Sequence, residues 1–172
     1  MRSIRRWLGF IGAVGGVLAL TACISVPGAR PFAIEMARTQ FAHIQDYLDA
    51  DAQKAPHGGF VEFVEAAGFH IDWLFLGMSD EELHAVRWDG RPAVVDAYED
   101  SRTGTVVVVQ YSNAYTGGGL MGNNYTVSAC WSFTVDLEKH SIEDLSDVEC
   151  PTKIDWMLKS VDEKLSVDEL RG

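Results

Sequence analysis

The chain has 172 residues, of which 47% are apolar, and a formal net charge of −11 at pH 7. Its 25 acidic and 14 basic side chains argue against nucleic-acid binding and against membrane attachment through a basic patch, because such a surface repels phosphate groups and anionic lipid headgroups. The length fits one domain with enough chain for a hydrophobic core.

The first residues have the organisation of an export signal. Residues 1–6 carry three arginines and no acid, and residues 7–20 form an uninterrupted apolar run. As a helix this run reaches about 21 Å, which is short of the ~30 Å hydrocarbon core of a bilayer. The pattern predicts a signal peptide. Extending the run to Val26 gives a borderline membrane span, so an uncleaved signal anchor is the alternative.

The sequence Leu20-Thr21-Ala22-Cys23 closes this run. It resembles the lipobox of bacterial lipoprotein precursors, in which a leucine and two small residues precede a cysteine. The resemblance covers residues 1–23. It implies that the Cys23 sulfur receives a diacylglyceryl group, that the chain is cut before Cys23, and that acyl chains, such as palmitate, hold the mature protein at a membrane.

This resemblance sets the expected organisation of the chain. Residues 1–22 are the signal peptide, residues 23–30 are a short tether, and residues 31–172 are a single globular domain. Removing the signal takes three basic residues and no acid, so eleven basic residues face twenty-five acids and the net charge becomes −14. We expect the protein on the extracytoplasmic face of the cell membrane or of the outer membrane; the sequence does not choose between them.

The remaining cysteines, Cys130 and Cys150, form an even pair in an oxidising compartment, where a disulfide is expected. They are symmetric about His140, so a turn there would place them opposite each other on an antiparallel ladder, at a separation that suits a disulfide. Two free buried thiols are the alternative.

Helical periodicity is clear near the start of the predicted domain. Apolar residues spaced by three and four predict a helix of about twenty residues from Pro31, with one buried stripe: Ile34, Ala37, Phe41, Ile44 and Leu48. A second helical piece covers Phe60 to Ala67. A similar spacing after Pro151 predicts a C-terminal amphipathic helix, carried by Ile154, Met157, Leu158, Val161 and Leu165.

Ser79 and Glu82 form a capping-box pattern, which predicts a short helix running toward Val86. The surrounding sequence "LGMSDEELHAV" is similar to the turn-and-helix segment of small envelope domains of the assembly-lipoprotein and β-lactamase-inhibitor type. The similarity covers about eleven residues, and no functional residue is carried over from it.

Strand signals dominate from Pro92 onward. Residues 92–98 and 103–113 are β-branched runs that predict a hairpin, and residues 125–135 alternate between apolar and polar side chains. One face of this strand should pack on the core while the other stays more polar. The predicted fold is α+β, with helices packed on one face of an antiparallel sheet of four to five strands and one disulfide.

A glycine-rich segment, residues 114–124, joins two of these strands. It is surrounded by aromatic and large apolar residues, which interfaces favour, so it is a candidate recognition loop comprising Tyr115, Leu120, Met121 and Tyr125. A flexible hairpin tip without a binding role is the alternative. The tryptophans Trp73, Trp88, Trp131 and Trp156 fit core positions better than a carbohydrate-binding row, which is the other reading.

Catalytic signatures are missing from the sequence. Five histidines, at 43, 57, 70, 84 and 140, have no metal-ligand spacing, and no Gly-x-Ser-x-Gly motif occurs. We therefore predict no catalytic residue, metal or cofactor. The predicted function is non-catalytic binding of an envelope protein or surface ligand by a lipid-anchored protein. The alternative is a cell-envelope hydrolase or metal-dependent enzyme, which would place His57, His70 or His84 beside two carboxylates in a cleft.

Overall fold

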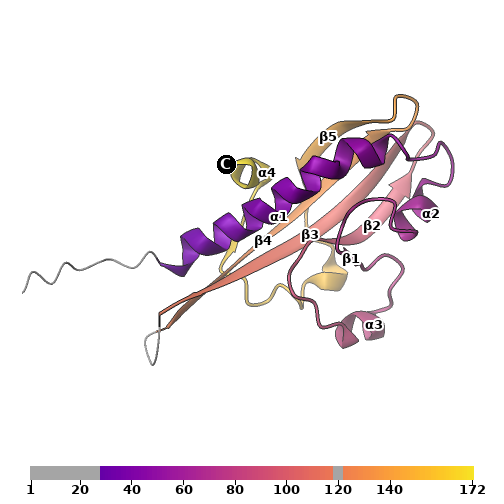
Figure 1. Cartoon of the computed structure of the whole chain (residues 1–172). Helices are drawn as coiled ribbons and strands as arrows, with labels where there is room; N and C mark the ends of the chain where they lie inside the picture. Colours follow the sequence, from indigo (N-terminus) through magenta and orange to yellow (C-terminus); the bar gives the residue numbers. More distant parts are fainter. Residues whose placement is uncertain (1–27, 118–121) are drawn as a thin grey trace, which may run out of the picture.

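The computed structural model describes residues 28–117 and 122–172. It shows an α+β domain in which a long helix crosses a twisted sheet (Figure 1). The helices are α1 (Ala29–Ala52), α2 (Phe60–Glu65), α3 (Asp80–Ala85) and α4 (Val167–Arg171). The strands are β1 (Trp73–Leu74), β2 (Ala93–Glu99), β3 (Thr103–Thr116), β4 (Asn123–Asp136), β5 (Ser141–Asp147) and β6 (Glu163–Lys164). None of the helices in these two ranges is both long and apolar enough to cross a membrane.

The sheet is mixed, so the prediction of an antiparallel sheet of four to five strands was wrong. Its order is β1-β2-β3-β4-β5, with β6 beside β4. The strands β2 to β5 are antiparallel to their neighbours, but β1 runs parallel to β2 and β6 runs parallel to β4. The two parallel strands are two residues long, which is too short for a periodic signal in the sequence.

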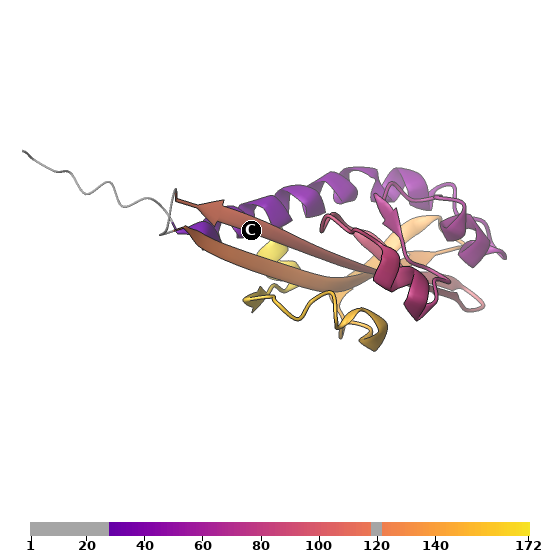
Figure 2. The ribbon, with the colours of Figure 1, turned by 90° about the horizontal axis from the view of Figure 1, so that it is seen from below.

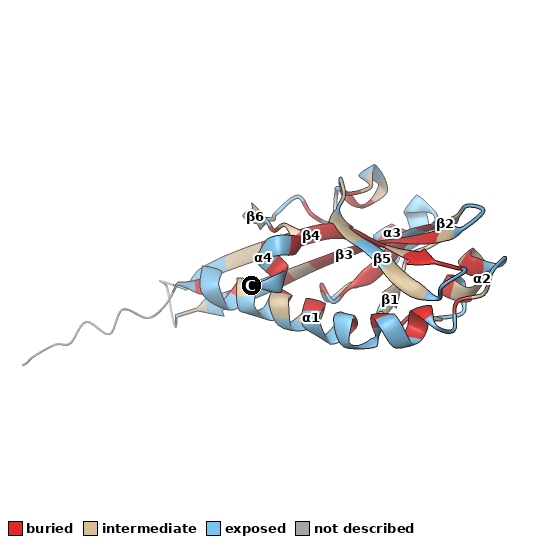
Figure 3. Cartoon of the chain, turned by 90° about the horizontal axis from the view of Figure 1, so that it is seen from above, coloured by how far each residue is buried: buried red, intermediate tan, exposed pale blue. Residues whose placement is uncertain are grey.

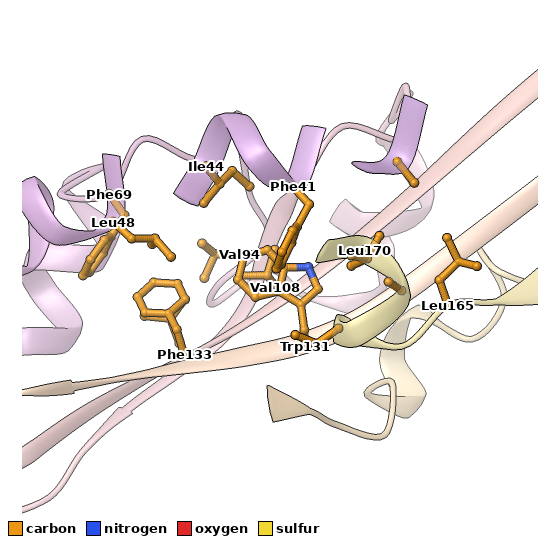
Figure 4. Packing of buried hydrophobic residues seen from close by; sticks show 14 of the residues in the cluster. Phe41, Ile44, Leu48, Phe69, Val94, Val108, Trp131, Phe133, Leu165 and Leu170 are labelled. Carbon is orange, nitrogen blue, oxygen red and sulfur yellow. The ribbon is translucent and has the colours of Figure 1, made fainter. Parts of the chain in front are cut away.

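The predicted first helix is confirmed as α1, which packs its apolar stripe on the sheet. Opposite it, the alternation along β4 places the expected apolar residues in the same core (Figure 4). Phe41 and Trp131 meet edge to face in this core, with 5.1 Å between ring centroids. Both side chains are fully buried, and such aromatic pairs stabilise a core beyond the apolar area they bury.

The opposite face of the sheet is also covered, which corrects the prediction that helices pack on one face only. A second core contains Leu83 of α3, Phe75, Ile154 and the disulfide. Figure 2 shows the segment after β5 lying on the face of the sheet opposite α1. The predicted C-terminal helix was wrong as well: a 3-10 turn, Thr152–Ile154, is followed by turns, β6 and the short α4. Ile154 and Leu158 are buried. The helix-like spacing of apolar residues after Pro151 therefore arises from residues that a series of turns buries against the sheet.

The hairpin of β3 and β4 is longer than predicted. Each strand has 14 residues, and their pairing continues to Thr116 and Asn123. Residues 114–116 and 123–124, which the sequence assigned to the glycine-rich segment, therefore belong to the strands. The hairpin end and the start of α1 lie at the same end of the molecule (Figures 1 and 2). Leu120 and Met121 lie outside the described residues.

The predicted disulfide between Cys130 and Cys150 is confirmed, with 5.3 Å between the Cα atoms. Its register differs from the prediction. A bulge after Thr134 shifts the pairing of β4 with β5, and the Cys130 carbonyl accepts a hydrogen bond from the Val148 N–H. Cys150 therefore follows the end of β5, where the disulfide ties the segment after β5 to β4.

Replacing both Cys130 and Cys150 with serine should lower the free energy of unfolding by about 3 kcal/mol, because the bond closes a loop of about twenty residues in the unfolded chain. Urea denaturation followed by tryptophan fluorescence measures this loss. Reduced wild-type protein should match the double variant. A wild-type stability that does not change on reduction would contradict the prediction.

Candidate functional site

The start of α1 and the paired ends of β3 and β4 lie together at one end of the molecule (Figures 1 and 2). Two of the four predicted recognition residues, Tyr115 and Tyr125, belong to the described chain, whereas Leu120, Met121 and the lipidation candidate Cys23 lie outside it. The structure separates the roles of the two tyrosines.

Tyr125 is engaged in holding the fold together. Its hydroxyl donates to Glu163 of β6 at 3.0 Å, and Arg30 of α1 donates two hydrogen bonds to the same carboxylate at 2.6 and 2.7 Å. The hydrogen bond to Glu163, together with burial, raises the pKa of Tyr125, and the hydrogen bonds from Arg30 lower the pKa of Glu163. This group fastens the start of α1 to the sheet.

Tyr115, by contrast, is 60% exposed. Its ring packs on Gly122 across the hairpin, where an added Cβ would clash with the ring. Glycine at position 122 therefore leaves room for the Tyr115 side chain, most of which stays exposed to solvent. An exposed aromatic ring of this kind is a favourable contact for a binding partner.

Two apolar side chains of α1 extend this surface. Figure 3 shows that α1 is buried along one stripe and exposed elsewhere. Phe32 is 48% exposed and Met36 is 46% exposed, and both lie outside that stripe. With Glu35, Thr39 and Gln40 they line a shallow groove of about 360 Å³. We call this the α1 groove. The sequence held a signal for it, because Phe32 and Met36 fall one helical turn apart and outside the buried stripe.

The histidines do not assemble a metal site in the part of the chain described. The Nδ1 atom of His70 lies 2.7 Å from Asp51 Oδ2, and His70 ion-pairs with no second carboxylate there. His84 Nδ1 lies 2.6 Å from the Asp80 carbonyl oxygen, and its ring stacks on Trp156. Within residues 28–117 and 122–172, no three His, Cys, Asp or Glu side chains are placed to hold a metal ion.

Asp51 has a structural role. Its carboxylate is 1% exposed and accepts hydrogen bonds from the His70 N–H at 2.9 Å and from Lys54 Nζ at 3.0 Å. Burial alone would raise the pKa of Asp51, but the hydrogen bonds from His70 and Lys54 outweigh it and lower the pKa below its ordinary value. The charged carboxylate joins the end of α1 to the loop before β1.

A second hollow lies on the face of the sheet opposite α1. Trp88, Tyr111 and Trp156, with two apolar side chains, line about 150 Å³. That volume is below the range typical of ligand pockets. The Trp88 indole donates to the Arg91 carbonyl oxygen, and the Tyr111 hydroxyl donates to the Trp88 carbonyl oxygen. The buried indole N–H of Trp156, by contrast, has no hydrogen-bond partner among the described residues. All three aromatic side chains pack against the second core, to which the hollow belongs. Trp131 is buried in the first core, so the tryptophans form no carbohydrate-binding row.

Substituting Asp51 with alanine should lower the free energy of unfolding by about 2 kcal/mol, because buried hydrogen-bond donors lose their acceptor. Chemical denaturation measures this loss. Asp49→Ala is the matched control, since Asp49 is exposed on the same turn of α1 and should change stability by less than about 0.5 kcal/mol. Equal effects of the two substitutions would contradict the structural role.

Asp136 gives the fold a dependence on acid pH. It accepts hydrogen bonds from the Lys139 side chain and from the backbone N–H groups of Lys139 and Glu138. These interactions, with the Lys139 side chain first, lower the pKa of Asp136 from 3.8 to about 2. Because the folded-state pKa is the lower one, the stabilisation is complete above pH 3.8 and is lost as the pH falls toward 2.

Asp136→Asn should therefore lower the melting temperature at pH 6, and the difference from wild type should shrink as the pH falls from about 4 to about 2. Thermal unfolding followed by circular dichroism at a series of pH values checks this. A difference between the two proteins that stays constant across that interval would show that the Asp136 charge does not stabilise the fold.

No protein-family model, curated protein or solved structure matches this chain. What the protein does must therefore be inferred from its own residues and their arrangement.

Proposed function

We propose that this protein is a lipid-anchored protein of the bacterial cell envelope that acts on the extracytoplasmic side as a non-catalytic binding module. Its partner is another envelope protein or a surface ligand, and its attachment to the membrane is through acylated Cys23. The observation that carries the proposal is the clustering of exposed apolar side chains at the end of the domain next to the tether.

The lipobox-like sequence and the disulfide support the extracytoplasmic location. Disulfides persist in oxidising compartments such as the bacterial periplasm and are rare in the cytosol. Cys130 and Cys150 are bonded, and Cys23 has the sequence context of a lipidation site. One compartment accounts for all three cysteines.

The position of α1 supports an orientation in which the start of this helix lies toward the membrane. From Cys23 to Ala29, where α1 begins, a fully extended chain spans at most about 21 Å. A lipid on Cys23 would thus keep the start of α1, and the hairpin end beside it, close to the bilayer. The β2–β3 and β4–β5 turns then point away from the membrane (Figure 1).

Exposed apolar residues support a binding role at this end. Five large apolar side chains are exposed in the described chain, and three of them, Phe32, Met36 and Tyr115, lie in the first half of α1 or at the hairpin end. Exposed apolar groups that gather on one surface mark interaction sites more often than scattered ones do. Within residues 28–117 and 122–172, no three His, Cys, Asp or Glu side chains form a metal site that would compete with this surface.

Lipidation is tested by growing cells that express the tagged full chain with an alkyne analogue of palmitate. Wild-type protein should carry the label and its mature N-terminus should be Cys23, whereas Cys23→Ala should lose all label because no thiol accepts the lipid. In-gel fluorescence and intact mass spectrometry provide the readouts.

Ser25→Ala, which changes a neighbour of the lipidation site, is the matched control and should label like wild type. Unlabelled wild-type protein, or equal labelling of Cys23→Ala, would refute the anchor. Unlike membrane fractionation, this readout also separates a lipid anchor from an uncleaved signal anchor.

A further inference from the structure

The last residues of β3 form an open edge of the sheet. β2 pairs with β3 as far as Val109, and the Tyr111 N–H then donates to the Gly90 carbonyl oxygen. Backbone groups alternate sides along a strand, so those of Asn113 and Tyr115 point the same way as those of Tyr111. In the described part of the chain no backbone group pairs with Asn113 or Tyr115 on that side.

Gly90 explains why the pairing ends there. Its φ is +91°, a conformation that glycine adopts easily, and an added Cβ would clash with the Tyr111 carbonyl oxygen. The chain turns away from β3 at this point, toward Trp88. The edge beyond Tyr111 is therefore left open by a local backbone constraint.

The outer strands β5, β1 and β6 are less suited to pairing with another chain. The outer strand β5 carries Glu143, Asp144 and Asp147, and charges on an edge strand discourage pairing with another chain. The strands β1 and β6 are two residues long, which also limits pairing. The segment Asn113–Thr116, with the sequence "NAYT", carries no charge and no proline.

The α1 groove runs beside this open edge. Gln40, which lines the groove, accepts a hydrogen bond from Ser112 of β3 at 3.1 Å. On the helix, Met36 and Phe32 lie one and two turns before Gln40 on the same flank. The opposite flank carries Arg30 and packs toward β6 and α4. An added strand beside Asn113–Thr116 would therefore have apolar groove side chains on one of its faces.

We propose that this edge binds an extended segment of a partner protein, which adds a strand to the sheet beside Asn113–Thr116. Backbone hydrogen bonds to Asn113 and Tyr115 would supply affinity, and alternate side chains of the segment would contact Phe32 and Met36. The inference rests on the proposed binding function and names the kind of partner.

Charge defines the segment further. Among the described residues that line the α1 groove, Glu35 is the one charged side chain, and the chain as a whole has a net charge of −11. A segment with apolar residues at every second position and basic residues between them complements both features. A second copy of this chain would instead bring the same net negative charge and the same Glu35 to the edge, so self-pairing is disfavoured.

The test is selection of random twelve-residue peptides displayed on phage against the full chain purified in detergent. Enriched peptides should alternate apolar and basic residues, and the synthetic peptides should slow amide hydrogen exchange at Asn113 and Tyr115. Asn113→Pro removes one outward N–H and leaves the ladder to β4 intact. Met36→Asp places a charge in the groove. Each should weaken peptide binding about tenfold or more.

Tyr98→Asp is the matched control, because Tyr98 is 55% exposed and pairs with Thr105, at the other end of β3 from Asn113–Thr116. It should change the affinity by less than about twofold. If Asn113→Pro does not fold, Met36→Asp alone carries the test. The proposal fails if no peptide is enriched over a blank surface, or if binding survives both substitutions.

Sedimentation of the purified chain tests the competing occupant. A dimer that Asn113→Pro converts to a monomer would show that a second copy covers the edge, and it would overturn the assignment to a partner protein.

Peptide binding in detergent does not depend on whether Cys23 carries a lipid. A negative peptide result therefore refutes binding at the strand edge, whereas a negative palmitate result refutes the lipid anchor.

Discussion

The arrangement of the domain depends on one buried set of contacts that joins α1 to the centre of the sheet. Trp131 of β4 is fully buried against the Phe41 ring, and its indole lies within 3.4 Å of the Gln110 side-chain oxygen. The Gln110 amide donates in turn to the Ala37 carbonyl oxygen at 3.0 Å. A buried amide without these partners would carry a large desolvation penalty, so the group fixes where α1 crosses β3 and β4.

Fixing α1 in this way determines which surfaces remain available. The helix begins beside the hairpin end because its middle is held at Trp131, and Arg30 adds a second attachment through Glu163. The flank that carries Arg30 is covered by β6 and α4, so the flank with Met36 and Phe32 stays open. An exposed apolar groove next to an unprotected strand end follows from these packing constraints.

The N-terminal sequence and the exposed surface beside the start of α1 together support the proposed function. The lipobox-like residues indicate a location, and the structure indicates which end of the domain would face the membrane. A binding surface near the anchored end suits a protein that meets its partners close to the bilayer. The remaining ionisable groups with lowered pKa values, such as Asp51 and Asp136, are held by hydrogen bonds within the fold.

Long periodic segments were predictable from sequence because each reads as one pattern over many residues. The spacing of Phe41, Ile44 and Leu48 correctly predicted α1, and the alternation about Trp131 predicted the core face of β4. Sequence reasoning failed where the signal was short or ambiguous. The residues from Ile154 to Leu165 have helical spacing, but the disulfide and the pairing of β6 hold them as turns and a strand.

The candidate site was predictable only in part. Tyr115 and Tyr125 have the same residue type and lie at the same hairpin end, yet one is exposed and the other is bonded to Glu163, a residue 38 positions later. By itself the sequence determined the long helix and the hairpin strands, because these depend on local periodicity, and the two cysteines beyond residue 23 predicted the disulfide. Only the tertiary structure decided which tyrosine is free and which strand edge is open, because both depend on contacts between residues far apart in the chain.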